Sequence, residues 1–112
     1  MSHTTDEALS DLDATDWPFA DAPNTACATT KHVMHDGLPV LYVAHETEDG
    51  TWQFHYGGSV SMSDLLLVGI RTVFRRDPTI AEIADLPLGW QATRIAVGQP
   101  WARRQSPPNE SE

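Results

Sequence analysis

The sequence predicts a single α+β domain with a mainly antiparallel sheet, a central β-hairpin, and two or three short helices on one side of the sheet. Three observations support this prediction. Two strand-like runs flank a turn near the middle of the chain, and a short apolar stripe with helical spacing follows them. The chain has 112 residues, which is too short for two independent hydrophobic cores. Mixed elements around a meander are typical of the α+β class.

The hairpin is the clearest element. Residues 40–45 are β-branched and aromatic, residues 46–50 have the composition of a turn, and residues 51–56 alternate with period two. Alternation directs three aromatic side chains to one side of the hairpin, which we expect to face the core: Trp52, Phe54 and Tyr56. Pairing Glu46 with Thr51 adds Leu41, Val43 and His45 to that side, and it leaves His55 on the opposite side with Tyr42.

Further elements are expected on both sides of the hairpin. Residues 25–29 indicate a short strand, and residues 31–36 indicate one or two helical turns that Thr30 caps and Gly37 ends. After the hairpin, residues 65–70 form an unbroken apolar run. Such a run favours a buried strand over a half-exposed one, with a helix as the alternative.

The C-terminal half continues with helices and one more strand. Residues 71–76 indicate a short helix, after which Asp77 and Pro78 are suited to cap and begin another. That helix has an apolar stripe at Ile80, Ile83 and Ala84 and is expected to end at Leu86-Pro87. Residues 88–94 alternate and predict a last strand, which extends no further than Val97.

The two ends of the chain are expected to lie outside the domain. We predict an acidic, partly disordered arm over residues 1–22, the domain over residues 23–102, and a disordered tail over residues 103–112. Within the arm, Trp17 and Phe19 flank a proline. They indicate either an anchor that docks the arm on the domain, which we favour, or a recognition motif for a partner.

Charge and composition exclude several classes of function. The formal net charge is −9, and residues 1–50 hold ten acids against Lys31 alone, so nucleic acid is not expected as a partner. No apolar run approaches the ~20 residues that span a bilayer, and the acidic N-terminus lacks the features of a signal peptide. We therefore expect a cytoplasmic protein without membrane contact. The single cysteine excludes an internal disulfide.

Two histidines are the candidate metal ligands. His32 and His35 are three residues apart on a predicted helix, so both imidazoles lie on one face. A third ligand would have to come from His45, His55, Cys27 or a carboxylate such as Asp36. The two hairpin histidines face opposite ways, so they cannot both join. The alternative is a pair of solvated histidines, and we predict no cofactor.

The sequence shows no catalytic centre. Cys27 lies between two alanines in a predicted strand, where a small buried side chain is the usual occupant. Gly57-Gly58 lacks the further glycine and lysine of phosphate-binding loops, and the chain has no Gly-x-Ser-x-Gly motif. Most carboxylates fall in the arm and the hairpin turn, where water keeps them ordinary acids. We therefore predict a protein that is not an enzyme.

Aromatic side chains provide the candidate binding residues. Trp52 and Trp90 alternate with other apolar positions and are expected in the core. Trp17, Phe19 and Trp101 lie near the ends of the predicted domain, and we take them as the residues with which the protein could bind a partner.

Four segments together resemble a known family: Thr30-Lys31-His32-Val33, residues 37–43, residues 49–54, and Leu86-Pro87-Leu88-Gly89-Trp90. They are similar to small bacterial proteins of unknown function, some of them related to immunity proteins of polymorphic toxin systems. The resemblance covers about residues 25–102 and carries no catalytic residues. It implies stoichiometric binding of a basic toxin domain by an acidic surface. We therefore expect a non-catalytic protein-binding domain with a basic protein partner. A small-ligand or metal-binding module that uses His32 and His35 is the alternative, and the sequence does not assign an oligomeric state.

Overall fold

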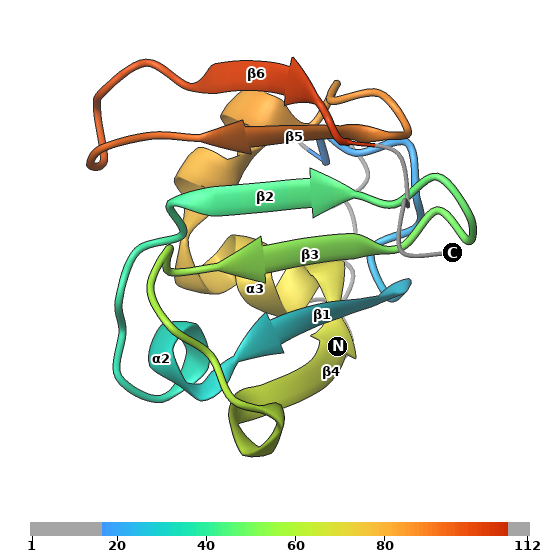
Figure 1. Ribbon diagram of the computed structural model, residues 1–112. Helices are drawn as coiled ribbons and strands as arrows, with labels where there is room; N and C mark the ends of the chain where they lie inside the picture. The colour runs from blue at the N-terminus through green and yellow to red at the C-terminus, as the bar shows by residue number, and fades with distance from the viewer. Residues whose placement is uncertain (1–16, 108–112) are drawn as a thin grey trace, which may run out of the picture.

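The computed structural model describes residues 17–107, which form an α+β domain around one six-stranded sheet (Figure 1). Its strands lie in the order β4-β1-β3-β2-β5-β6. In chain order they are β1 (Ala26–Thr30), β2 (Tyr42–His45), β3 (Trp52–His55), β4 (Leu65–Gly69), β5 (Trp90–Thr93) and β6 (Ala102–Gln105). The helices are α2 (Lys31–Met34), α3 (Ile70–Arg76) and two 3-10 helices, η1 (Met62–Asp64) and η2 (Pro78–Ile83).

The predicted hairpin is the centre of the sheet. Strands β2 and β3 pair antiparallel with Val43 opposite Phe54 and His45 opposite Trp52. The Glu46 N–H donates to the Thr51 carbonyl at 2.8 Å, so the predicted register is confirmed. All neighbouring strands pair antiparallel except β1 and β3, which are parallel. The sheet is therefore mixed but mainly antiparallel.

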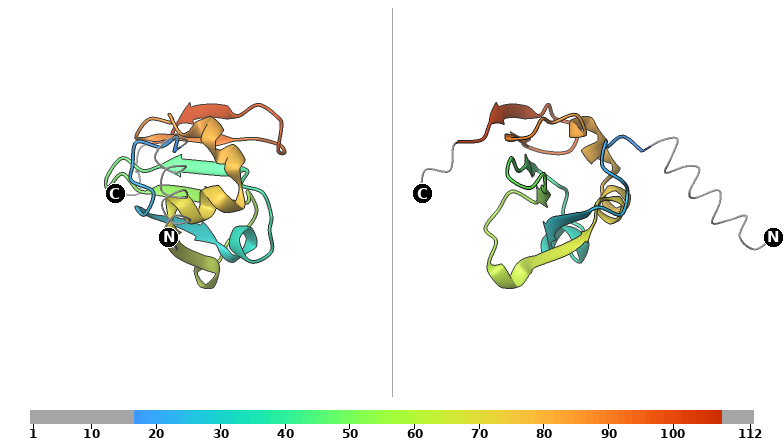
Figure 2. Two further views of the ribbon diagram at one scale, coloured as in Figure 1. Left: turned by 180° about the vertical axis from the view of Figure 1, so that it is seen from behind. Right: turned by 90° about the vertical axis from the view of Figure 1, so that its right-hand side faces the viewer.

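Helices cover one face of this sheet and leave the other face open. In Figure 2, α3 and η2 lie together on one side of the strands. Buried apolar side chains of the strands, the helices and the connecting segments form the core: Phe19, Cys27, Val33, Val40, Val43, Trp52, Phe54, Ile70, Val73, Ile80, Ile83, Leu86 and Ala92. Burying this apolar surface is the main source of stability for the fold. No helix within residues 17–107 is long and apolar enough to cross a membrane.

The helix boundaries follow local rules with one exception. Gly37 has φ +74° and ends the segment after α2, a backbone conformation that favours glycine. Asp77 accepts a hydrogen bond from the Thr79 N–H and caps η2, as predicted. Thr30 precedes α2 but its side chain makes no capping hydrogen bond. The hydroxyl of Thr30 is instead buried without a partner among the described residues.

The apolar run at residues 65–70 differs from its prediction. It forms the strand β4, but that strand lies at the edge of the sheet and is not buried. Leu66 and Val68 point toward the core side, whereas Leu65 is 40% and Leu67 78% exposed. Helices cover only one face of the sheet, so the side chains of β4 on the other face have no layer over them, which explains the difference.

The domain also extends beyond both predicted boundaries. Strand β6 covers Ala102–Gln105, so the sheet continues into the predicted disordered tail. At the other end, Phe19 is 5% exposed in the core and its ring contacts Trp52 at 5.1 Å between centroids. The anchor interpretation of this segment is therefore confirmed. The rest of the predicted acidic arm, residues 1–16, lies outside the described residues, as do residues 108–112.

Candidate functional site

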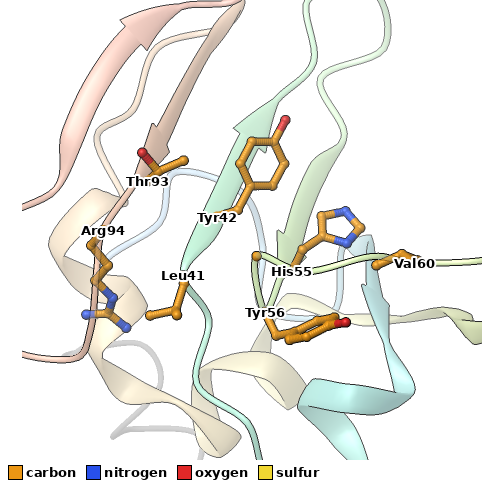
Figure 3. A pocket seen from close by; sticks show the side chains of 9 residues that line it. Leu41, Tyr42, His55, Tyr56, Val60, Thr93 and Arg94 are labelled. Atoms are coloured by element: carbon orange, nitrogen blue, oxygen red, sulfur yellow. The ribbon is translucent and has the colours of Figure 1, made fainter.

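A pocket of about 410 Å³ opens where β2 begins and β3 ends (Figure 3). Tyr42, His55 and Thr93 project from three neighbouring strands on the helix-free face and form one wall. Leu41 and Tyr56 directly flank β2 and β3, and they line the remainder with Gly57, Gly58, Val60 and Arg94. The volume lies within the range of ligand-binding clefts, roughly 300–1,000 Å³.

Hydrogen bonds across the open face fix the protonation of His55. Gln53 donates from Nε2 to the Glu46 carboxylate at 2.8 Å, so its Oε1 faces the His55 Nε2 atom at 2.9 Å. An amide oxygen only accepts, so Nε2 of His55 carries the proton and Nδ1 is an acceptor. Nδ1 is buried and has no partner among the described residues. Burial also lowers the pKa of His55 from its ordinary value, which keeps the ring neutral.

Arg94 lines the pocket, but its guanidinium is bound to Val40 and Asp77. Its Nε and Nη2 atoms donate to the Val40 carbonyl at 3.1 and 2.8 Å, and Nη2 lies 3.4 Å from an Asp77 oxygen. Figure 3 shows the guanidinium pointing away from Tyr42 and His55. The pocket wall therefore consists of aromatic rings, apolar side chains and hydrogen-bond acceptors, with its only cation already paired.

Exposed apolar side chains continue from the pocket on two sides. Val60 lines the pocket and is itself exposed. On the other side, Ile95 follows Arg94 directly and is 87% exposed, and Val97 is exposed two residues later. Large apolar side chains that remain in water beside a concave site are a feature of binding surfaces.

The predicted aromatic binding residues are placed apart from this pocket. Phe19 is a core residue, and Trp17 is half-buried against it and against Phe74 of α3. Trp101 is half-buried at the start of β6, where its ring lies under Arg94 and its Nε1 atom donates to Glu82 at 3.0 Å. All three residues therefore support the fold.

The two candidate metal ligands are not part of a larger cluster. His32 stacks on Tyr56 with 4.2 Å between ring centroids, and His35 is exposed after α2. Within residues 17–107 no three His, Cys, Asp or Glu side chains lie together as a metal site requires. The pair supplies two ligands at most.

Cys27 and His45, the other two candidate reactive side chains, are held by contacts of the core. Cys27 is fully buried, and desolvation raises the pKa of its thiol to about 12, so it has no thiolate character. His45 donates from Nδ1 to the Leu86 carbonyl at 2.8 Å and stacks on Trp52. Neither residue lies in the pocket. The predicted arrangement, with His45 on the core side and His55 opposite, is confirmed.

Sequence reasoning did not identify the pocket residues as a site. The alternation of β3 and its pairing with residues 40–45 did place His55 and Tyr42 on the same face, and this was the one feature of the sequence that indicated part of the pocket. The contribution of Thr93 depends on the pairing of β2 with β5, whose segments are far apart in the chain. Comparison with models of protein families, with curated proteins and with solved structures found no match.

Proposed function

We propose that this chain is a non-catalytic protein-binding domain and that its pocket receives an arginine side chain of a basic partner protein. The observation that carries the proposal is the composition of the pocket wall, which offers the Tyr42 ring, several acceptors and no unpaired cation. Arginine is a frequent anchor residue at protein interfaces. An immunity-type role, in which the domain blocks a basic toxin, is the form of this function that the family resemblance implies.

The wall suits a guanidinium for two reasons. The face of an aromatic ring attracts a planar cation, and the Tyr42 ring is one of the groups that line the pocket (Figure 3). The hydroxyls of Tyr42 and Thr93 add acceptors beside it. The apolar stem of an arginine would lie along Leu41 and Val60.

The net charge of the chain supports a basic partner. Residues 17–107 hold nine acidic and seven basic side chains, a net charge of −2 out of the −9 of the whole chain. Most of the excess negative charge therefore belongs to the two ends of the chain. Such a field accelerates the approach of a basic protein, and salt screens it. Binding would then weaken as the salt concentration rises.

Capped arginine is the simplest probe of the pocket. We expect N-acetylarginine amide to shift the NMR signals of Tyr42, His55 and Thr93 in the full chain. The matched probe is N-acetylcitrulline amide, which has the same shape without the charge and should bind more weakly. Replacing the ring by Tyr42→Ala should abolish the response. Leu88→Ala, at an exposed residue beyond the opposite end of β2, is the control.

The native partner provides the second measurement. A basic protein captured from the native cell by the wild-type chain should be lost with Tyr42→Ala, retained with Leu88→Ala, and released by salt. Equal responses to the arginine and citrulline probes would contradict the pocket chemistry. A partner held equally by both variants would place binding at another surface.

A further inference from the structure

The two edges of the sheet differ in chemistry. Strand β6 carries Arg103 and Arg104 at its centre, and such charges prevent an edge from pairing with another strand. Strand β4 has the sequence Leu-Leu-Leu-Val-Gly without a charge or a proline. No other strand of residues 17–107 lies on its outer side, as the lower edge of the sheet in Figure 1 shows. Long exposed apolar edges are rare because they pair with other strands.

The backbone groups that β4 directs outward follow from its register. The Ile70 N–H donates to the Thr25 carbonyl at 2.9 Å, and antiparallel hydrogen-bonded pairs recur at every second residue. Leu66 and Val68 therefore bond to β1, whereas Leu65, Leu67 and Gly69 direct their N–H and C=O groups to the free edge. The Leu65 N–H does not bond to β1 and donates to the Met62 carbonyl, which agrees with this register.

Among the described residues, four backbone groups at the edge then have no partner. They are the Leu65 C=O, the Leu67 N–H and C=O, and the Gly69 N–H, since the Gly69 carbonyl lies at the N-cap of α3 and accepts a bond within that helix. An antiparallel strand with Leu67 opposite Leu67 places each N–H against a C=O. Two bonds join the Leu67 residues, and one joins each Leu65 C=O to the Gly69 N–H of the other copy.

We propose that a second copy of this chain pairs with β4 in this register, which joins the two sheets into one. The edge is complementary to itself, because all four groups find partners and no donor or acceptor is left over. Leu65 of one copy lies opposite Gly69 of the other, so no side chain opposes it there. The two Leu67 side chains lie side by side on the helix-free face, where each is 78% exposed in the single chain.

Charge at the edge is compatible with this pairing. The five residues of β4 carry none. The repulsion between two chains of net charge −9 opposes association, but seven of these charges lie outside residues 17–107. Salt screens such repulsion, so the dimer should strengthen with salt. This is the opposite of the salt dependence expected for a basic partner.

Sedimentation of the full chain from micromolar to millimolar concentration measures the self-association. One short strand pair buries little surface, so we expect a weak, reversible dimer. Leu67→Lys should reduce the association constant at least tenfold, because it places two like charges opposite each other. Leu88→Lys adds the same charge at an exposed leucine away from β4 and should leave the constant unchanged.

Amide hydrogen exchange on the wild-type chain tests the register without a variant. Exchange at Leu67 and Gly69 should slow as the protein concentration rises, while Leu66 and Val68 are already protected by β1. A monomer at every concentration overturns the proposal. So does a dimer whose added protection falls outside β4, or one that salt dissociates. None of these results bears on the arginine pocket, which lies beside β2 and β3.

Discussion

The Nη2 atom of Arg94 lies 3.4 Å from an Asp77 carboxylate oxygen, and the Arg94 side chain has no exposed surface. The same Asp77 oxygen accepts a hydrogen bond from the Val40 N–H at 2.9 Å, while Arg94 donates to the Val40 carbonyl. Three distant segments therefore meet in one group of contacts: the end of β5, the cap of η2 and the chain that enters β2.

We expect Arg94→Met to lower the free energy of unfolding by about 3–5 kcal/mol, because removing one partner of a buried ion pair leaves the other charge unpaired. Urea unfolding monitored by tryptophan fluorescence measures the change. Arg103→Met is the matched control. Arg103 pairs with Asp85 at 2.8 Å, but both side chains are exposed, so the loss should stay below about 1 kcal/mol. Equal losses in the two variants would contradict a structural role specific to Arg94.

Phe19 allows a test of where the domain begins. Its ring packs edge-on against Trp52 and Phe54, and Phe19→Ala would leave a cavity in the core. We expect a loss of about 3–5 kcal/mol in unfolding free energy. Trp17→Ala, two residues earlier and half-buried, should cost clearly less. A loss below about 1 kcal/mol for Phe19→Ala would mean that this segment is dispensable for the domain.

Local patterns were sufficient to predict the centre of the fold. Alternation in β3, the turn residues around Gly50 and the cap at Asp77 each depend on neighbours within a few residues. The same alternation placed His55 opposite the core. These signals do not depend on the rest of the chain, so sequence alone contained them.

The sheet edges depend on pairing over long distances, which local patterns do not contain. The apolar composition of β4 suggests burial, but its position at the edge follows from its pairing with β1. Strand β6 has no apolar alternation, and it forms because it pairs with β5. The pocket depends in the same way on the pairing of β2 with β5.

The thiol of Cys27 should be unreactive in the folded protein. Burial raises its pKa to about 12, against 9.0 for an ordinary thiol, and only the thiolate attacks disulfides. At about pH 8 a chromogenic aromatic disulfide should therefore label the chain only after urea unfolds it. A labelling rate that is independent of urea would contradict the buried environment. The folded state keeps this proton more tightly, so the stabilising effect of the neutral thiol is lost as the pH rises from about 9 toward 12.

His55 should be neutral, with its proton on Nε2, under conditions in which an exposed histidine is half charged. Burial lowers its pKa below the ordinary value of 6.5, and Gln53 lies between the ring and the Glu46 carboxylate. The unfolded chain therefore binds the proton more tightly. The contribution of His55 to stability is present above pH 6.5 and is lost as the pH falls through the folded-state pKa.

Imidazole nitrogen shifts measured by NMR across this pH range report both properties of His55. We expect an unprotonated Nδ1 signal at neutral pH and a titration midpoint below the ordinary value of 6.5. Gln53→Leu removes the acceptor that holds the proton on Nε2, so the two tautomers should then become mixed. A His55 midpoint at or above 6.5 would contradict the effect of burial on its pKa. A protonated Nδ1 in the wild type would contradict the hydrogen-bond chain from Glu46 through Gln53 to His55.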